Sequence, residues 1–171
     1  VRRRLEQRSS QVVGLRYFNV YGPRESHKAR MASVAWHAFH QFRADGHVKL
    51  FESSAGYAAG EQRRDFILVD DVVAVVRWLL ATPSVSGIFN VGTGKARSFR
   101  DLISAVYRAL GTEPKLEYVD MPEKIRGQYQ YFTESKVDNL RRAGYNASFT
   151  PLEDGVKRYV TQFLDTSDRY R

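Results

Sequence analysis

The sequence predicts an α/β fold in which strands alternate with helices and the chain ends in helices. Short runs rich in β-branched and aromatic residues predict strands. Longer segments with apolar residues at helical spacing predict helices. The two kinds of segment alternate along the chain, and no repeat or low-complexity stretch interrupts them. This order is typical of α/β proteins.

The first segments predict a strand, a loop and a helix. The run VVGLRYF at 12–18 predicts a buried strand. Residues 19–28 contain a Gly-Pro pair, so we expect a loop there. Apolar residues at helical spacing predict a helix over 31–42, and Gly46 lies just beyond it as a stop signal.

The middle of the chain predicts a short strand, an irregular stretch and an apolar helix. VKLF at 48–51 predicts the strand, and the polar, glycine-containing stretch 52–64 predicts irregular structure. VVAVVRWLLAT at 72–82 predicts the helix. Asp70 is its expected N-cap, because a short acidic side chain can accept a hydrogen bond from the first helical turn.

The last part predicts a strand, a glycine turn and several helices. GIFNVGTGK at 87–95 predicts the strand and its turn. Ser98 and Asp101 have the spacing of a capping box, with Asp in place of the usual Glu or Gln. We expect the helix that they open to end at Gly111. The remaining predicted elements are a strand at 115–119 and helices near 134–143 and 151–164.

Composition bounds the class of protein. The 171-residue chain is 43% apolar and 27% charged, an ordinary balance for a soluble globular domain. It has no cysteine, so disulfides and thiolate metal sites are excluded and a cytoplasmic location is expected. No run approaches the roughly 18 apolar residues of a membrane span, so no membrane partner is expected.

The net charge of +8 is compatible with nucleic acid, a membrane surface or a phosphorylated small molecule as partner. Much of the excess lies in Arg2, Arg3, Arg4 and Arg8, which we interpret as an exposed face at a helix end. No nucleic-acid recognition motif is present, so nucleic-acid binding is not expected. A non-catalytic basic binding module stays open as an alternative, which DNA binding that falls steeply with salt would favour.

Two common phosphate-binding patterns are absent from the sequence. VGTGKA at 91–96 lacks the first Gly and the final Ser or Thr of a phosphate loop. No G-x-G-x-x-G occurs, and no tyrosine is followed four residues later by lysine. The chain therefore lacks the usual motif that holds a dinucleotide phosphate.

The stretch RYFNVYGPRESHK at 16–28 is the most informative. It follows a strand, where open α/β sheets place their ligands, and it gathers an amide, aromatic rings, a guanidinium, an imidazole and an amine. R-x-F-N-V-Y-G-P-R resembles a signature of the extended short-chain dehydrogenase/reductases that act on nucleotide sugars. RRDFILVDDV at 63–72 and GIFNVGTG at 87–94 resemble their second and third signatures, in the same order.

A narrower resemblance covers nearly the whole chain. YGPRESHK, LFES at 50–53 and PEKIRGQYQYFT at 122–133 resemble the ADP-heptose 6-epimerases. The resemblance implies inversion at C6 of ADP-D-glycero-D-manno-heptose through a transient ketone, a step toward the heptose of lipopolysaccharide. It also implies an ADP-sugar substrate, NADP (or NAD) as the cofactor of each subunit, and a homo-oligomer.

The resemblance further implies that residues 1–171 are one carboxy-terminal fragment. The last Rossmann-like strands and helices would be interleaved with a smaller mixed α/β substrate-binding domain, and the first cofactor-binding βαβ units would be absent. The chain begins with Val rather than Met. We therefore expect this chain alone neither to hold the nicotinamide cofactor stably nor to turn over.

Lys28 is the residue to which the resemblance assigns the second acid/base and a contact with the cofactor. Inversion by oxidation and re-reduction needs a proton carrier near the oxygen in each half of the reaction. A lysine can serve only if burial or nearby positive charge lowers its pKa. Arg24, His27 and Arg30 could supply that charge. The alternative is a solvated loop lysine.

Three further residues receive roles by resemblance. The Asn19 amide would contact the substrate, and the alternative for Asn19 is a turn former that bonds its own backbone. Val20 would pack against the nicotinamide. His37 would bind substrate, although its neighbours Trp36 and Phe39 are also typical of a buried core helix.

The remaining substrate contacts come from two later stretches. Arg64 would clamp the diphosphate, because a guanidinium fork matches phosphate oxygens with two hydrogen bonds; its alternative is a surface cation. Tyr129 would contact the substrate, while Tyr131 is the competing choice and would be a packing ring. The other residues with implied substrate contacts are Phe51, Glu52, Ser53 and Ser54.

The chain departs from the family pattern in three places. Arg30 stands where a small serine usually contacts the substrate, and Ser53 replaces a glycine. The loop at 55–62 is several residues longer than expected, which could reshape the adenosine pocket. Another nucleotide-sugar epimerase or dehydratase of the same superfamily is the runner-up. Lys28→Ala in a restored enzyme should abolish heptose inversion but leave a dehydratase largely unaffected.

Overall fold

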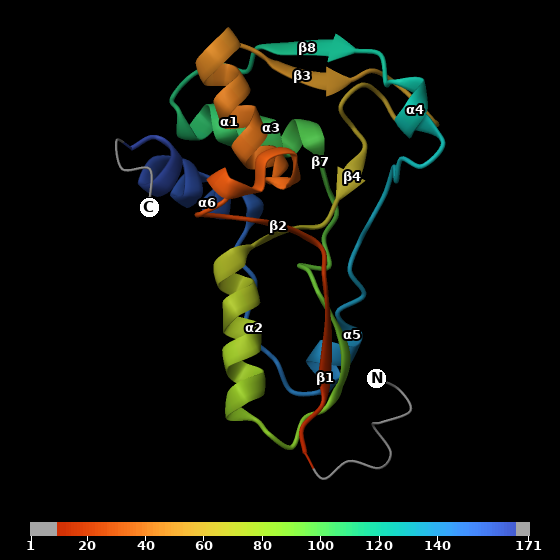
Figure 1. Cartoon of the computed structure of the whole chain (residues 1–171), viewed down its shortest axis with the longest axis vertical. Helices are drawn as coiled ribbons and strands as arrows, with labels where there is room; N and C mark the ends of the chain where they lie inside the picture. The colour runs from red at the N-terminus through yellow and green to blue at the C-terminus, as the bar shows by residue number, and fades with distance from the viewer. Residues whose placement is uncertain (1–9, 167–171) are drawn as a thin grey trace.

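A computed structural model describes residues 10–166 of the chain. The molecule is elongated, with one group of strands and helices at each end of its long axis (Figure 1). Each group has its own cluster of buried apolar side chains. The arginine-rich start, Arg2 to Arg8, lies outside the described residues.

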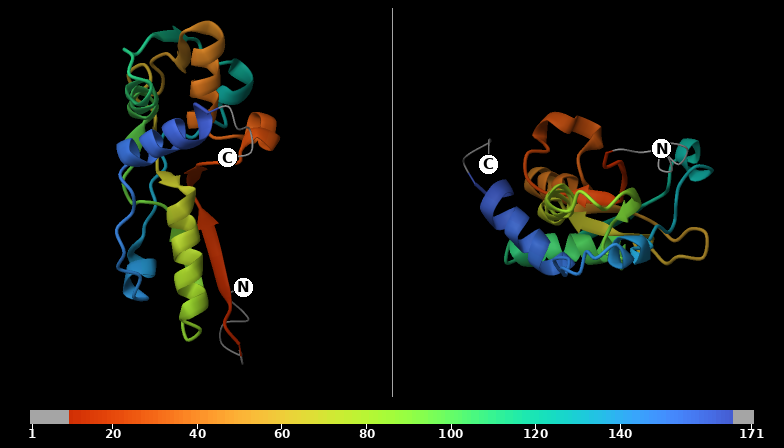
Figure 2. Two further views of the ribbon diagram at one scale, coloured as in Figure 1. Left: turned by 90° about the vertical axis from the view of Figure 1, so that its left-hand side faces the viewer. Right: turned by 90° about the horizontal axis from the view of Figure 1, so that it is seen from below.

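The lower group in Figure 1 is built on parallel strands. Strand β1 (Val13–Tyr17) pairs in parallel with β6 (Gly87–Val91). Helix α2 (Val69–Ala81) runs alongside β1 in both Figure 1 and Figure 2. Helix α5 (Asp138–Arg142) packs near β6. Apolar residues of these elements form one core, whose fully buried members include Ile67, Val75, Val91 and Leu140.

Two short strand pairs lead from the lower group to the upper one. Strand β2 (Asn19–Tyr21) pairs in parallel with β5 (Phe66–Leu68). Strand β4 (Arg63–Arg64) pairs in antiparallel fashion with β7 (Arg97–Ser98). The fold is therefore mixed α/β rather than purely parallel.

The upper group packs helices against a third parallel pair. This pair joins β3 (Val48–Phe51) with β8 (Leu116–Val119). The surrounding helices are α1 (Val34–Asp45), α3 (Phe99–Ala109), the short α4 (Glu123–Arg126), and α6 (Leu152–Tyr159) with the π-helical turn η3 (Val160–Leu164) that continues it. Together they bury a second core, which includes Ala35, Val48, Ile103, Val106, Tyr107 and Val156.

Several helix ends are confirmed. Ser98 accepts a hydrogen bond from the Asp101 N–H, and the Asp101 carboxylate accepts one from the Ser98 N–H, so the capping box forms. Gly46 ends α1 with a left-handed φ of 72°, which suits glycine because it has no Cβ to clash. Gly111 follows the end of α3 as expected.

Three sequence-based expectations are wrong. Residues 19–28 are not simply a loop: Asn19–Tyr21 form β2, and Ser26–Met31 form a 3₁₀ helix, η2. Asp70 does not cap α2, because β5 runs directly into the helix at Leu68 and Asp70 lies in the first turn, where its carboxylate pairs with Arg158. The helix expected near 134–143 is shorter, because only Asp138–Arg142 are helical.

One acidic residue of α2 ties the two groups of elements together. Both carboxylate oxygens of Asp71 accept hydrogen bonds from Thr150, from its N–H at 2.8 Å and its hydroxyl at 3.0 Å. Thr150 lies just before α6, in the upper group. Within residues 10–166, no helix combines the length and apolar character needed to cross a bilayer.

Candidate substrate site

Two of the residues predicted to bind ligand, Asn19 and Val20, lie in β2, which follows β1 where the chain passes from the lower to the upper group (Figure 1). The Asn19 N–H donates to the Asp65 carbonyl at 3.0 Å, and Asn19 lies opposite Phe66 in the β2–β5 pair. This pairing brings the first and second signatures side by side. Since Asn19 lies within a strand, the alternative that it forms a turn is wrong.

Glu25 holds the turn that carries Lys28. Its side chain is buried, with 3% of its surface exposed. Its carboxylate accepts hydrogen bonds from the Gly22 N–H (3.2 Å), the Ser33 N–H (2.6 Å), the Ser33 hydroxyl (2.7 Å) and the Tyr159 hydroxyl (3.2 Å). These contacts join both ends of the loop 22–33 to the last part of α6.

The same contact keeps Tyr159 protonated. Burial, together with the negative charge of the Glu25 carboxylate, raises the pKa of the Tyr159 hydroxyl far above its ordinary value. The hydroxyl can therefore act as a stable donor to Glu25. The sequence analysis gave Glu25 no role, although a lone acid between Arg24 and His27 was a usable signal.

Lys28 lies on η2 with its side chain exposed. Its backbone N–H donates to the Glu25 carbonyl at 2.9 Å. Arg24, His27 and Arg30 lie on the same loop and are also exposed. Among the described residues, the Lys28 amine makes no hydrogen bond or ion pair with Asn19 or with any other side chain. Its assignment as an acid/base stays a prediction.

Arg64 is buried, with 8% of its surface exposed, so the alternative of a surface cation is wrong. Its guanidinium lies 5.5 Å from the centre of the Phe99 ring and 5.2 Å from that of Tyr129, within range for cation–π attraction. Its Nη1 donates to the Arg63 carbonyl at 2.8 Å. No carboxylate of the described residues pairs with it, and burial lowers its pKa.

An open pocket begins at this guanidinium. It is lined by Arg64, Tyr129 and three residues from or next to α4: Ile125, Gln128 and Gln130. An arginine remains charged even when its pKa falls, because its ordinary value is so high. A buried charge without a partner is costly, and an anion in the pocket would offset that cost.

A chain of aromatic rings, called here the aromatic wall, extends from Tyr129, which lines this pocket. Phe51 meets Tyr129 edge to face with ring centres 5.7 Å apart, and Tyr129 meets Tyr131 at 5.1 Å. Tyr131 stacks on Tyr57 at 6.1 Å with 13° between the planes. The Tyr131 hydroxyl also lies 3.0 Å from the Ser54 Oγ. Tyr131 thus packs between Tyr129 and the longer loop, as its alternative role required.

The loop at 55–62, which was expected from the sequence to be longer than in the family, contributes Tyr57, a residue with no predicted role. A bridge between Ser54 and Tyr57 closes a tight turn. Arg100 of α3 anchors the far end, since its guanidinium donates to the Ala59 carbonyl at 3.0 Å and pairs with the Glu61 carboxylate at 3.3 Å. Tyr57 of this loop therefore extends the aromatic wall, and α3 holds the loop in place.

The other predicted contacts are more dispersed. Glu52 and Ser53 are exposed beside the pocket wall, and their roles stay predictions. His37 is half-buried on α1 and contacts the edge of Trp36, with ring centres 5.1 Å apart. Val20 is half-buried in β2. The structure brings together Phe51, Ser54, Arg64 and Tyr129, but it shows no contact between this group and His37 or Lys28 among residues 10–166.

Asp65 fixes the surroundings of Arg64, and the sequence analysis gave it no role. It is fully buried, and its carboxylate accepts hydrogen bonds from the Thr93 N–H (2.7 Å), the Thr93 hydroxyl (2.7 Å), the Gly94 N–H (2.9 Å) and the Ser135 N–H (3.0 Å). It joins the third signature and the segment after Tyr131 to the second signature. An acid directly before the apolar run Phe66–Leu68 was the available signal.

Known proteins resemble this chain in sequence and in fold. The chain is 49% identical over 180 residues to "ADP-L-glycero-D-manno-heptose-6-epimerase" of Thiobacillus denitrificans, covering 97% of this chain and 54% of that protein. The crystal structure of the Helicobacter pylori enzyme of that name superimposes with a TM-score of 0.73 at 34% identity, over 90% of this chain and 45% of that one. UDP-glucose 4-epimerase of Thermus thermophilus, solved with NAD, gives a TM-score of 0.71 at 26% identity, over 90% and 46%.

The chain spans about half the length of the curated relatives it matches. The solved structures confirm the predicted mixed α/β fold of an extended short-chain dehydrogenase/reductase. A family model described as "NAD dependent epimerase/dehydratase family" matches residues 1–92, which contain all of the first two signatures and most of the third. By that match, the chain belongs to the NAD dependent epimerase/dehydratase family.

Proposed function

We propose that this chain supplies the substrate-binding half of an ADP-L-glycero-D-manno-heptose 6-epimerase. Relatives of about 50% identity that carry this name support the choice of ADP-heptose over other nucleotide sugars. The protein would invert C6 of the heptose through a transient ketone. The fragment boundary 1–171, the homo-oligomer and the cytoplasmic location expected from the sequence belong to the same proposal.

The observation that carries the proposal is the buried guanidinium of Arg64, which pairs with no carboxylate of residues 10–166. Two aromatic rings hold it at the mouth of an open pocket. A diphosphate there would accept charge-assisted hydrogen bonds from the part of the fork that the Arg63 carbonyl leaves free. Tyr129 and Phe51 would pack beside the nucleotide, which would enter along the aromatic wall.

The chemistry would take place at the other end of the substrate. Lys28 would give and take a proton at the oxygen of C6, while Glu25 keeps its turn fixed. Asn19 would hold the sugar through its amide. In this arrangement Arg64 would bind the phosphates, and the heptose would extend toward η2.

The residues present fit one edge of a nicotinamide cofactor. Val20 is apolar, half-buried and near the end of β2, where a nicotinamide ring could pack. The sequence holds no G-x-G-x-x-G, so these residues would contact the nicotinamide end only. When bound, the cofactor accepts hydride from the sugar carbon and returns it. We propose NADP, with NAD as the alternative.

Binding of ADP to the 171-residue chain tests the Arg64 pocket. Calorimetric titration should show binding that Arg64→Ala weakens at least about tenfold, since a buried charge-assisted contact is lost. Arg63→Ala is the matched control, because Arg63 is its exposed neighbour. Equal affinity of the Arg64→Ala and Arg63→Ala variants for ADP would contradict the proposal.

Activity tests the role of Lys28. Since the chain spans about half the length of its relatives, the chimera would join it to the amino-terminal half of the Thiobacillus denitrificans relative. Lys28→Ala in this chimera should abolish epimerisation and leave ADP affinity within about twofold. Full activity of the Lys28→Ala chimera would refute the acid/base role.

The structural likeness to UDP-glucose 4-epimerase favours a second candidate, an epimerase or dehydratase for another nucleotide sugar. The nucleotide distinguishes the two. UDP binding more tightly than ADP in the titration above would favour the second candidate.

A further inference from the structure

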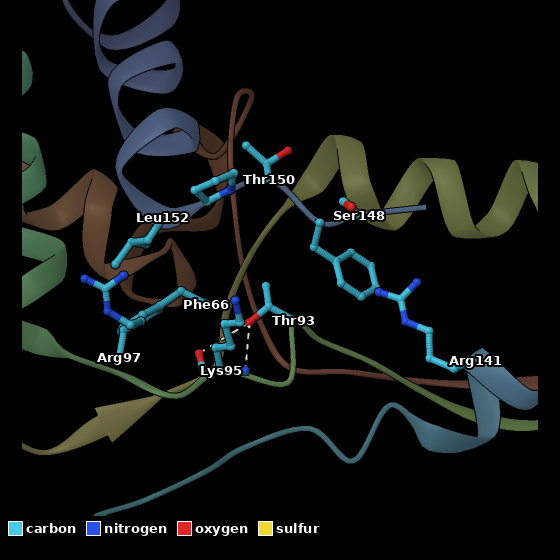
Figure 3. Close-up of a pocket in the computed structure, with 10 residues that line it drawn as sticks. Phe66, Thr93, Lys95, Arg97, Arg141, Ser148, Thr150 and Leu152 are labelled. Carbon is cyan, nitrogen blue, oxygen red and sulfur yellow. Dashed lines mark hydrogen bonds between the residues drawn. The ribbon is translucent and has the colours of Figure 1, made fainter. Parts of the chain in front are cut away.

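A second pocket lies on the side of β5 and β6 near α5 and the start of α6, and it shares no lining residue with the Arg64 pocket. Its volume is about 310 Å³, at the lower end of the range for small-molecule sites. Three cations line it, Lys95, Arg97 and Arg141, together with the hydroxyl-bearing residues Thr93, Ser148 and Thr150. Figure 3 shows the Lys95 and Arg141 side chains reaching it from opposite sides.

These two cations have no carboxylate partner among the described residues. Lys95 makes no ion pair within residues 10–166, and Arg141 donates only to the carbonyls of Tyr145 (2.8 Å) and Ala147 (2.7 Å). The backbone under Lys95 is held, because its N–H donates to the Thr93 hydroxyl at 3.2 Å. Two positive charges without a carboxylate partner among residues 10–166 therefore face one cavity.

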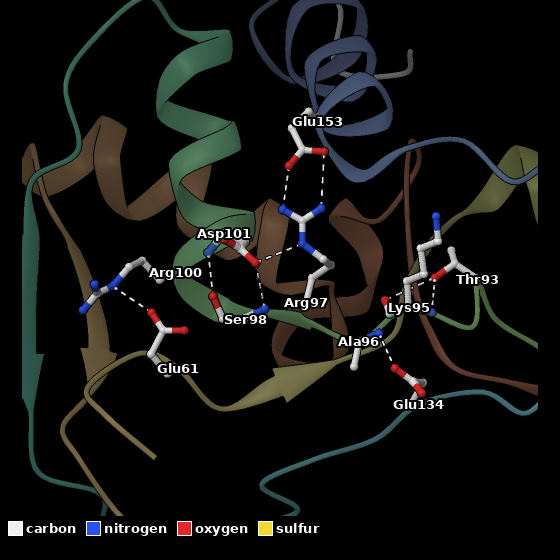
Figure 4. Close-up of polar contacts among 10 residues, drawn as sticks. All are labelled: Glu61, Thr93, Lys95, Ala96, Arg97, Ser98, Arg100, Asp101, Glu134 and Glu153. Carbon is white, nitrogen blue, oxygen red and sulfur yellow. Dashed lines mark hydrogen bonds and ion pairs between the residues drawn. The ribbon is translucent and has the colours of Figure 1, made fainter.

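The nearby acids are already engaged. Asp71 accepts both of its hydrogen bonds from Thr150. Glu153 accepts from the guanidinium of Arg97, with its closest contact at 2.6 Å, and Figure 4 draws no interaction between that pair and Lys95. Arg97 is thus neutralised, whereas the positive charge of Lys95 and Arg141 is not.

We propose that this pocket binds a small organic phosphate monoester. Such a group carries about two negative charges at neutral pH and offers three acceptor oxygens, which matches the two cations Lys95 and Arg141 and the Ser148 hydroxyl; the Thr150 hydroxyl already donates to Asp71. Phe66 and Phe149 provide apolar surface beside the charges, so the organic part would lie against these rings. Inorganic phosphate alone would fill only the polar end.

Thermal unfolding of the 171-residue chain tests the proposal with two probes, inorganic phosphate and glucose 6-phosphate. Both should raise Tm in a saturable way beyond sodium chloride at equal ionic strength, because a ligand that binds the native state stabilises it. Glucose 6-phosphate should reach half its effect at a lower concentration. Equal half-saturation by the two probes would overturn the organic part of the proposal.

Charge reversal locates the site. Lys95→Glu should raise the half-saturating concentration at least about tenfold. Lys115→Glu is the matched control, since Lys115 is equally an exposed lysine and lies outside the pocket, and it should respond as the parent does. Equal responses of these two variants would overturn the proposal. So would a response that Arg64→Ala removes and Lys95→Glu retains, because binding would then be at the Arg64 pocket.

Discussion

Replacing Glu25 with alanine removes one buried carboxylate that joins the Lys28 turn to α6. The four hydrogen bonds it accepts would be lost together. At about 1 kcal/mol of net stability each, their sum is about 4 kcal/mol. Water can reach the half-buried Ser33 and replace part of its lost hydrogen bonding. Tyr159 has only 1% of its surface exposed, so its hydroxyl would be left without an acceptor. We expect Glu25→Ala to lower the free energy of unfolding by about 3 kcal/mol.

Two further variants separate charge from shape. In Glu25→Gln the side chain keeps its size, but its amide has only one acceptor oxygen. The amide NH₂ would face N–H and O–H groups that now donate to the carboxylate, so these donors would lose their acceptor. We expect a loss of about 2 kcal/mol. Tyr159→Phe removes one of the four bonds and should cost about 1 kcal/mol. Because Glu25 and Tyr159 share a hydrogen bond, the Glu25→Ala/Tyr159→Phe double variant should lose about 1 kcal/mol less stability than the sum of the two single variants.

Urea unfolding followed by circular dichroism measures these differences as shifts of the midpoint at an unchanged slope. Glu113→Ala is the control, since Glu113 is exposed and should change stability by less than about 0.5 kcal/mol. A Glu25→Ala loss below about 1 kcal/mol, or strict additivity with Tyr159→Phe, would refute the network.

Two other predictions concern packing and pH. Gly155→Ala should lower stability by about 2 kcal/mol in the same urea assay, because a Cβ there would lie 2.1 Å from the Tyr21 hydroxyl oxygen. Gly127→Ala is the control and should be nearly neutral, since a Cβ there would meet nothing within 4 Å. Equal effects of the two substitutions on stability would contradict the clash. A hydrogen bond from Arg97 lowers the pKa of Glu153 below its ordinary 4.5. This contribution to stability is present above that value and is lost as pH falls through the lowered pKa. Arg97→Gln should therefore flatten the decline of Tm below pH 4.5, and an unchanged profile would disprove the link.

Sequence patterns located most of the regular elements because their signals are local. The apolar runs at 12–18, 48–51 and 87–91 became strands, and the Ser98 capping box formed, since each depends on neighbours within a few residues. The helix cap at Asp70 failed for a non-local reason: a strand feeds directly into α2, and Arg158, far along the chain, pairs with the carboxylate.

The site was predictable only in part, for the same reason. Family resemblance pointed to Arg64 and Tyr129, which the structure places in contact. Burial of Arg64 could not be read from the sequence, because the covering rings come from Phe99 and from the segment after α4. Tyr57 was missed because its stacking on Tyr131 depends on how a longer loop folds back.

Adjacent residues of the second signature divide structural and binding work between them. Arg64 ends β4, and Asp65 follows it directly, before β5 begins. The Asp65 carboxylate accepts hydrogen bonds from the backbone N–H groups of Thr93, Gly94 and Ser135. The last of these bonds anchors the segment that carries Tyr129, the ring beside Arg64. Asp65 therefore helps to hold the segment of Tyr129, the ring against which Arg64 lies. The Arg64 guanidinium itself pairs with no carboxylate of residues 10–166. An Asp65→Asn change should consequently weaken ADP binding without contacting the nucleotide, because the wall would move away from Arg64.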